Sequence, residues 1–421
     1  MDPVKELVRQ RPDFFAYRSA WMSEAARIND FVYMSQGLSN AYLLLTRAGR
    51  IVINTGMGFE APVHRKLFDA VCPGPTPWII LTQGHVDHVG GVSLFREEGT
   101  QLVAQRNNGV CQRDDERIRA VRQTQSATWF GAAVAAGTGG AGTRAAFRQD
   151  VPVPDVLFDD SYRIDCGGLA LELLATPGGE TIDSCVVWLP ERRIVFSGNV
   201  FGPLFPHFPN FNTIRGDRYR YFEPYLESLR RVRALEPELL ITGHFEPVAG
   251  RELIRTCLDR LEAAVDWVHR RTLDGMNAGK DIWTLMGDVQ LPEELYVGQG
   301  YGKVSWAVRT IWETYMGWFK AQHTSELYAT QPAGIYPDLV GLAGIDAVVA
   351  RGQAKLTAGE PEAANLLAEA ALAADAAHRG ALTLALQAHQ SLLDRSGAVN
   401  FWETGWLRAR IRELQAKLGA A

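Results

Sequence analysis

The chain has 421 residues, 47% of them apolar, which is enough for two domains with hydrophobic cores. The formal net charge of −5 argues against a general nucleic-acid-binding surface, and no apolar run has the length of a membrane span. Five scattered cysteines form neither a disulfide framework nor a close metal-binding spacing. The N-terminal segment lacks the basic and apolar regions of a secretory signal. We therefore expect a cytoplasmic protein without a nucleic-acid or membrane partner.

The first part of the chain has a mixed α/β pattern. Residues 1–30 form a charged and aromatic arm, and from about residue 31 to 250 short apolar runs alternate with helical stretches and Gly/Pro turns. This alternation is typical of sheets covered by helices. Residues 106–150 form an insertion rich in Gly and Ala between 131 and 142, which we interpret as a lid over a site. A disordered excursion is the alternative.

From residue 251 onward the pattern becomes helical. Residues 363–372 predict an amphipathic helix whose small side chains allow close helix packing. An array of helix pairs of the tetratricopeptide type is an alternative, although no clean repeat of fixed length is present.

The most informative segment is residues 82–91, Thr-Gln-Gly-His-Val-Asp-His-Val-Gly-Gly. It follows the apolar run 78–81, which predicts a buried strand. Two imidazoles and a carboxylate after a strand suit a divalent transition metal. His85 and Asp87 share one side of an extended segment while Asp87 and His88 diverge, so the cluster can serve two ions. The alternative is an ordinary turn or helix cap, with Asp87 as the capping residue.

The segment resembles the signature of the metallo-β-lactamase fold, His-x-His-x-Asp-His-x-x-Gly, with Gln83 in the place of the first His. Residues 175–181 resemble the family's Thr-Pro-Gly-His-Thr motif, with Glu180 at the His position. Residues 194–199 resemble the strand that ends in a metal-bridging Asp, with Asn199 in its place, and residues 240–244 resemble the strand before the last His. The resemblance implies an α/β fold, an αββα sandwich, over residues 1–250.

Further segments are similar to alkylsulfatase-like members of that family. Residues 177–180 are close to their Pro-Gly-Thr-Glu segment, and residues 212–216 resemble a stretch in which an Arg helps to hold sulfate. Residues 300–319 resemble a helix of their dimerisation domain, although Trp306 and Ala307 replace the usual His and Asn. The resemblance implies an all-α dimerisation domain over residues 251–421 and a homodimer formed through the C-terminal helices.

The larger relatives usually carry a further module similar to sterol-carrier proteins, and this sequence ends before it. We therefore expect a smaller or more soluble substrate than a long-chain detergent.

If the ligands follow the family, three side chains hold each of two ions. One ion is held by Gln83, His85 and Glu180. The other is held by Asp87, His88 and His244. Asn199 stands at the bridging position, where it removes a negative charge and weakens the binding of two ions together, so a single ion is an alternative. Zinc is the expected cofactor, with Mn or Fe as alternatives that accept an amide oxygen.

The implied activity is hydrolysis of an ester-like bond in a small-molecule substrate by a metal-activated hydroxide. The bond can be a sulfate ester, a carboxylic ester or a lactone. Asp87 can also orient the nucleophile, Arg215 can clamp an anionic group, and Tyr301 can donate a hydrogen bond to a leaving oxygen. The alternatives are a structural salt bridge for Arg215 and core packing for Tyr301.

Two other functions stay open at this point. One is hydrolysis of an amide, such as a β-lactam. The other is a non-enzymatic role for a family member with a degraded metal site, which the neutral side chains of Gln83 and Asn199 suggest.

Overall fold

The computed structural model describes residues 2–138, 149–218 and 220–420. By its internal contacts the chain divides into two compact units, Met1–Thr314 and Tyr315–Ala421. All strands of the described residues belong to the first unit. The sequence changes from mixed to helical structure near residue 250, and a domain boundary at that residue stays a prediction.

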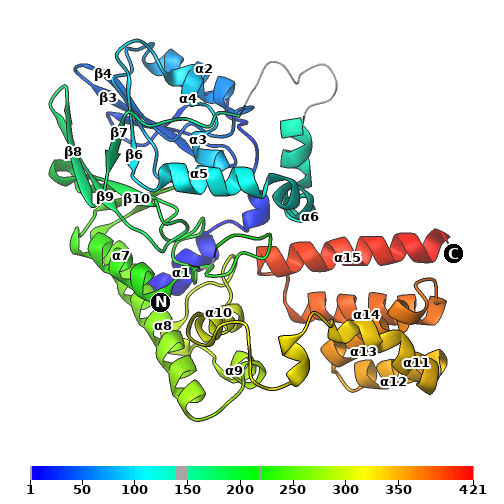
Figure 1. Cartoon of the computed structure of the whole chain (residues 1–421). Coiled ribbons are helices and arrows are strands. Elements are labelled where there is room, and N and C mark those ends of the chain that lie inside the picture. The colour runs from blue at the N-terminus through cyan, green and yellow to red at the C-terminus, as the bar shows by residue number, and fades with distance from the viewer. Residues whose placement is uncertain (1, 139–148, 219, 421) are drawn as a thin grey trace. The chain divides into compact units, whose positions relative to one another are not determined.

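In the described residues the first unit has two sheets (Figure 1). The first sheet has seven strands in the order β1 to β7, antiparallel from β1 to β4 and parallel from β4 to β7. Its strands are β1 (Ala26–Arg27), β2 (Val32–Ser35), β3 (Ala41–Thr46), β4 (Gly49–Ile53), β5 (Trp78–Ile80), β6 (Gln101–Gln105) and β7 (Val156–Phe158). The strand predicted at residues 78–81 is thus present as β5.

The second sheet has six strands among the residues described, in the order β13-β12-β11-β10-β9-β8. Its strands are β8 (Ser161–Cys166), β9 (Leu169–Ala175), β10 (Cys185–Leu189), β11 (Ile194–Gly198), β12 (Leu239–Thr242) and β13 (Val248–Ala249). Only β11 and β12 run parallel in it, so their carboxyl ends reach the same edge.

Alternating apolar side chains create the layers of the first unit. Ile51 and Ile53 of β4 lie in the core between the two sheets, whereas Val52 faces the other way, into the core under the helices. These helices are α2 (Ala61–Val71), α3 (Val86–Val89) and α4 (Val92–Phe95). The outer face of the second sheet is covered by α7 (Phe222–Ala234), α8 (Arg251–Asn277) and α10 (Val304–Met316). The predicted αββα sandwich is confirmed.

The N-terminal arm belongs to the same unit. Helix α1 (Pro3–Gln10) buries Val4 and Leu7 in the core that contains α8. Asp2 pairs with Arg260 of α8 at 2.9 Å, and the short helix α9 (Ile282–Asp288) adds to the same core. The arm then continues to the 3-10 turn η1 (Phe14–Ala16), which lies beside the candidate site.

The predicted insertion is helical where the structure describes it. Residues 106–138 contain α5 (Asn108–Arg117) and α6 (Arg119–Thr138), and the rest of the Gly-rich stretch, residues 139–148, lies outside the described residues. The alanines of this stretch favour helix strongly enough to outweigh Gly131. Both helices line the cavity described below.

The second unit is a set of sequential helices, namely α11 (Tyr336–Ala343), α12 (Ile345–Thr357), α13 (Pro361–Ala374), α14 (Arg379–Arg395) and α15 (Phe401–Ala420). The predicted helix over 363–372 lies within α13, where Ala364, Ala368 and Ala371 are buried. Within the described ranges, no single helix combines the length and apolar character of a bilayer span, and one bent pair, Pro332–Ala343 with Ile345–Thr357, meets the criteria only jointly.

Candidate metal centre

The ends of four strands bring the candidate residues together. Gln83 follows β5, Asn199 follows β11 and His244 follows β12, so both sheets contribute at one edge. Asn54, directly after β4, adopts a left-handed conformation with φ of 58°, which asparagine tolerates better than most residues. Its side-chain oxygen accepts a hydrogen bond from the backbone N–H of Thr82 at 3.0 Å. Asn54 therefore fixes the start of the 82–91 segment.

Asp87, His88 and His244 form the first group of possible ligands. One donor atom from each lies within 4.8 Å of the other two. The distance from His88 Nε2 to Asp87 Oδ2 is 3.6 Å. Ligands about 2 Å from a tetrahedral zinc ion lie roughly 3.4 Å apart, so a small inward movement would close this group around a cation.

Gln83, His85 and Glu180 form a second group, which is joined by direct contacts. Gln83 Nε2 donates a hydrogen bond to Glu180 Oε2 at 2.9 Å and lies 3.0 Å from His85 Nδ1. His85 Nδ1 lies 3.4 Å from Glu180 Oε2. The three side chains are buried. The structure thus brings together all six side chains predicted around the two ions.

Asn199 lies between the two groups. Its amide nitrogen is 3.2 Å from His88 Nε2, 3.1 Å from His244 Nε2 and 2.7 Å from Glu180 Oε2. Its carbonyl oxygen is buried without a hydrogen-bond partner among the described residues. A neutral amide thus lies between the two groups, and its bridging role stays a prediction.

Sequence reasoning missed a charged layer behind this site. Asp217 Oδ2 lies 3.3 Å from His85 Nε2, and Asp217 Oδ1 lies 2.8 Å from an Arg122 guanidinium nitrogen. The buried Arg220 lies 3.8 Å from both Glu180 and Asp217. A carboxylate on the second nitrogen of a ligand histidine is common at metal sites, because it fixes the ring. The only sequence signal for Asp217 was its place two residues after Arg215.

The surroundings prepare two of the histidines to bind a cation. Burial lowers the pKa of His88 to about 4 and also lowers the pKa of His244, so both rings are neutral near pH 7 and keep a free lone pair. Burial would lower the pKa of His85 as well, but the carboxylates of Asp217 and Glu180 outweigh it and raise this pKa to about 9. Burial opposes ionisation of Asp87, yet His88 and His244 hold its pKa below the ordinary value.

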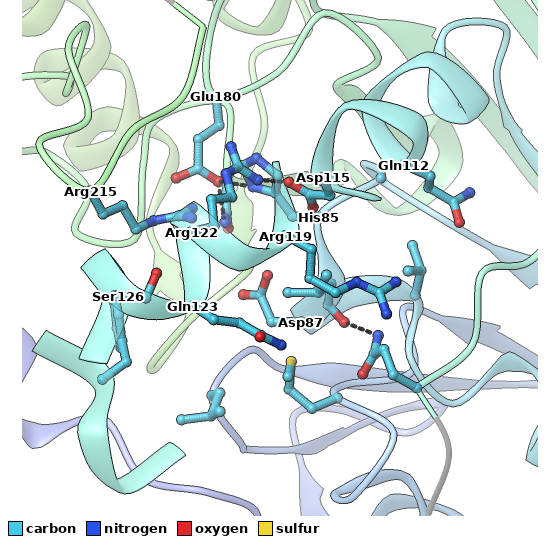
Figure 2. A pocket seen from close by; sticks show the side chains of 18 of the residues that line it. His85, Asp87, Gln112, Asp115, Arg119, Arg122, Gln123, Ser126, Glu180 and Arg215 are labelled. Atoms are coloured by element: carbon cyan, nitrogen blue, oxygen red, sulfur yellow. Dashed lines mark hydrogen bonds and ion pairs between the residues drawn. The ribbon is translucent and has the colours of Figure 1, made fainter. Parts of the chain in front are cut away.

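A cavity of about 380 Å³ opens onto both groups (Figure 2). Its polar wall comes from α5 and α6, and Arg119, Gln123 and Ser126 of α6 line the same cavity as Asp87 (Figure 2). Arg215 enters from the loop before α7 and has no hydrogen-bond or ion-pair partner among the described residues. Among these residues Arg215 therefore forms no structural salt bridge.

Aromatic rings close another side of the cavity. Phe14 of η1 packs edge-on against His244, with ring centroids 5.9 Å apart, and against Tyr301, with centroids 4.9 Å apart. Phe14 and Tyr301 are buried, and burial raises the pKa of Tyr301, so its hydroxyl stays protonated. Tyr301 thus lies at the predicted site and also packs in the core. The contribution of Phe14 had no signal in the sequence.

The donors present fit a divalent transition metal at the first group. Asp87, His88 and His244 offer one oxygen and two nitrogens, a ligand set that zinc accepts with a fourth position open. The carbonyl oxygen of Asn199 supports this assignment, because it is a buried polar atom next to this group that has no hydrogen-bond partner among the described residues. The second group has an orphaned oxygen on Gln83 but presents the amide nitrogen to Glu180.

The comparisons with known proteins agree with this geometry. The model of the metallo-beta-lactamase superfamily matches residues 34–244, half of the chain, and the chain belongs to this superfamily. The model for alkyl sulfatase dimerisation matches residues 285–408.

Curated relatives include a linear primary-alkylsulfatase of a Pseudomonas species, 29% identical over 321 residues, or 70% of this chain and 59% of that protein. An alkyl/aryl-sulfatase of Saccharomyces cerevisiae is 25% identical, over 79% of this chain and 55% of that protein. The chain thus spans less than two thirds of the length of these relatives.

Among solved structures, the stereoselective inverting sec-alkylsulfatase from a Pseudomonas species has the same fold, with a TM-score of 0.79 at 20% identity. The match covers 94% of this chain and 66% of that one.

Proposed function

We propose that the protein hydrolyses sulfate esters in a metal-dependent reaction. The observation that carries this proposal is the position of Arg215, which lines the same cavity as Asp87 and His244 and whose guanidinium has no ion-pair partner among the described residues. A metal ion at the ligand group and the positive charge of Arg215 would together suit a small anionic ester. The match to the alkyl sulfatase dimerisation model and the named activities of the relatives support the same substrate class.

The side chains have separate tasks in this reaction. Asp87, His88 and His244 would hold the metal ion, which supplies an acidified water and neutralises charge on an oxygen of the substrate. Arg215 binds sulfate oxygens with its planar fork. The Asp87 carboxylate accepts a hydrogen bond from the attacking water, and the protonated Tyr301 hydroxyl donates one to the departing oxygen.

The cavity walls position the rest of the substrate. Phe14, Tyr17 and Phe130 contribute aromatic surface to the cavity, which can cover an apolar alcohol portion and exclude water from the reacting bond. The polar side chains of α6 lie across from Asp87 and can bind a hydroxyl or amide of the same molecule. A compact ester with both kinds of surface fits this cavity better than a long unbranched chain.

The preferred metal in this proposal is zinc, and the assembly is a homodimer formed through the second unit. The donor set of one carboxylate and two imidazoles supports zinc. Large apolar side chains on the second unit, such as Leu342 at 88% exposure and Tyr328 at 68%, support a second copy as the group that covers them.

The experiment that tests the activity compares several classes of ester and amide. Purified protein is stripped with a chelator, reloaded with zinc and assayed on p-nitrophenyl sulfate, octyl sulfate, p-nitrophenyl acetate, a lactone and a chromogenic cephalosporin. We expect hydrolysis of the sulfate esters that disappears on stripping and returns with zinc. Turnover of the cephalosporin alone, or no turnover of any sulfate ester by the zinc-loaded protein, would contradict the proposal.

Arg215→Gln provides the matched test of anion binding. We expect it to raise KM for sulfate esters, whereas Arg218→Gln, which removes an exposed guanidinium of the same loop paired with Asp114, should leave KM unchanged. If both substitutions raised KM equally, the effect would come from the overall charge of the loop, which would contradict sulfate binding by Arg215.

A further inference from the structure

The two groups of possible ligands differ in what their atoms can bind. In the first, Asp87, His88 and His244 each present an atom with a lone pair toward a common centre. In the second, Gln83 directs its NH₂ group toward Glu180, and its amide oxygen has no hydrogen-bond partner among the described residues. The Gln83 amide thus acts as a donor to the carboxylate that would otherwise bind a second ion.

Glu180 already has three partners without an ion. It accepts hydrogen bonds from Gln83 at 2.9 Å and from Asn199 at 2.7 Å, and its other oxygen lies 3.8 Å from the Arg220 guanidinium. Arg220 is only 5% exposed and is held in place by the carbonyl oxygen of Asn210 at 2.7 Å. A fixed organic cation therefore stands next to the position of the second ion.

The charges of the site lead to the same result. Asp87, Glu180, Asp217 and Asp115 bring four negative charges, and the guanidinium groups of Arg220 and Arg122 offset two of them. One divalent ion balances the two negative charges that remain. A second ion would leave two positive charges without a counter-charge at a largely buried site, where uncompensated charge costs several kcal/mol. A carboxylate at position 199 would have offset part of this excess, but Asn199 is neutral.

We propose that this is a one-ion centre, in which Asp87, His88 and His244 hold a single divalent cation and the Gln83–Glu180–Arg220 network fills the place of a second. The inference rests on the metal dependence of the proposed function and adds its stoichiometry. Three protein ligands leave one position open for water or substrate, as in zinc sites that are catalytic rather than structural.

Metal content tests this without any assay of activity. The full chain is stripped, loaded with excess zinc, desalted and analysed for zinc per chain, and the binding curve is recorded by titration calorimetry. We expect about one equivalent in the natural chain and a large loss in His88→Ala and His244→Ala. His323→Ala, which removes an exposed histidine of the second unit, controls for zinc bound at the surface and should keep the natural ratio.

Substitutions in the network separate the one-ion and two-ion alternatives. Gln83→Ala and the nearly isosteric Glu180→Gln should both keep about one zinc per chain, because neither residue holds the ion. The double substitution Gln83→His with Asn199→Asp should raise the ratio toward two, since it supplies a lone pair and a bridging charge. Circular dichroism confirms that each variant is folded before its metal content is compared.

The outcomes distinguish the two proposals. Two equivalents of tightly bound zinc in the natural chain, or loss of zinc in Glu180→Gln, would overturn the one-ion centre and leave the proposed hydrolase intact. A folded natural chain that retains no zinc would overturn both.

Discussion

Asp217 Oδ2 lies 3.3 Å from His85 Nε2, while Nδ1 of the same ring points toward Gln83 and Glu180. The imidazole is therefore held at both of its nitrogens. The guanidinium of Arg122 in α6 lies 2.8 Å from Asp217 and forms a second ion pair with Asp115 of α5. The helices of the insertion are thus tied to the centre through a chain of charged side chains.

Asp217→Asn tests the importance of this link. The neutral amide keeps the shape but loses the charge that orients His85 next to the ion, so we expect kcat/KM for sulfate esters to fall roughly 10–100-fold. The melting temperature of the stripped variant, measured in parallel, reports any loss of folding. Asp114→Asn removes a carboxylate of α5 that pairs with Arg117 and Arg218, and should leave kcat/KM unchanged.

His244→Ala and His85→Ala should both abolish turnover while the protein remains folded. His244 is lost as a ligand, whereas His85 is lost as the residue that orders Gln83 and Glu180 next to the ion. Circular dichroism and steady-state rates on the same preparations check this. Unchanged activity in either variant would remove that residue from the site.

Phe14→Ala should destabilise the protein by about 3–5 kcal/mol, as is usual for a buried phenylalanine. Phe14 is 4% exposed and packs on His244 and Tyr301, so the substitution also opens the centre to water. Urea unfolding measures the loss, and Phe15→Ala, at a less buried neighbouring position, should cost less. Equal losses at the two positions would show that the arm packs less specifically than the structure indicates.

The unfolding free energy of the stripped protein should fall as the pH drops below about 6.5. Burial lowers the pKa of His64 and His88 to about 4 and that of His207 to about 3, whereas the unfolded chain takes up protons from about 6.5 downward. The unfolded state then binds more protons, so stability decreases toward pH 4 and continues to do so as far as His207 titrates. Unfolding by urea at a series of pH values checks this, and His64→Gln should reduce the slope.

Above pH 6.5, His85 makes the unfolding free energy of the stripped protein decrease as the pH rises. Its pKa is raised to about 9 in the folded protein, so its contribution is fully present below pH 6.5 and is lost as the pH rises through 9. A stability that rises steadily from pH 6.5 to 9.5 in the stripped protein would contradict the ion pairs of His85 with Asp217 and Glu180.

Ending the chain at residue 319 or at residue 250 should give different results. The chain that ends at residue 319 keeps the first unit and the whole of α10, and we expect it to be a soluble monomer. The chain that ends at residue 250 lacks α8, whose Leu258, Leu261 and Val265 lie in the core against the second sheet. We expect this shorter protein to be insoluble. Light scattering on the soluble fractions measures the state of association. A dimer that persists in the chain ending at 319 would locate the dimer contact in the first unit.

The parts of the site that follow strands could be predicted from the sequence, because a strand and the turn after it leave a local pattern. The run before Gln83 and the motifs ending in Asn199 and His244 are of this kind. The order of these motifs, through the family resemblance, also indicated that distant residues meet. The fold of the sandwich followed from the same order.

The supporting contacts could not be predicted, because they depend on how loops approach one another. Arg220 and Asp217 reach the centre from an irregular segment, and Phe14 comes from an arm far from it in sequence. Likewise, Nδ1 of His207 accepts a hydrogen bond from the backbone N–H of Gly300, 93 residues further along the chain, at 3.0 Å. The periodicity of a sequence does not predict such contacts between loops.

The packing of Phe14 between His244 and Tyr301 has a consequence for how the molecule is made. Phe14 cannot make both contacts until Tyr301, 287 residues further along the chain, has been synthesised. Such long-range closure slows folding. During synthesis the Phe14 side chain therefore stays exposed, and this wall of the cavity is completed late in folding.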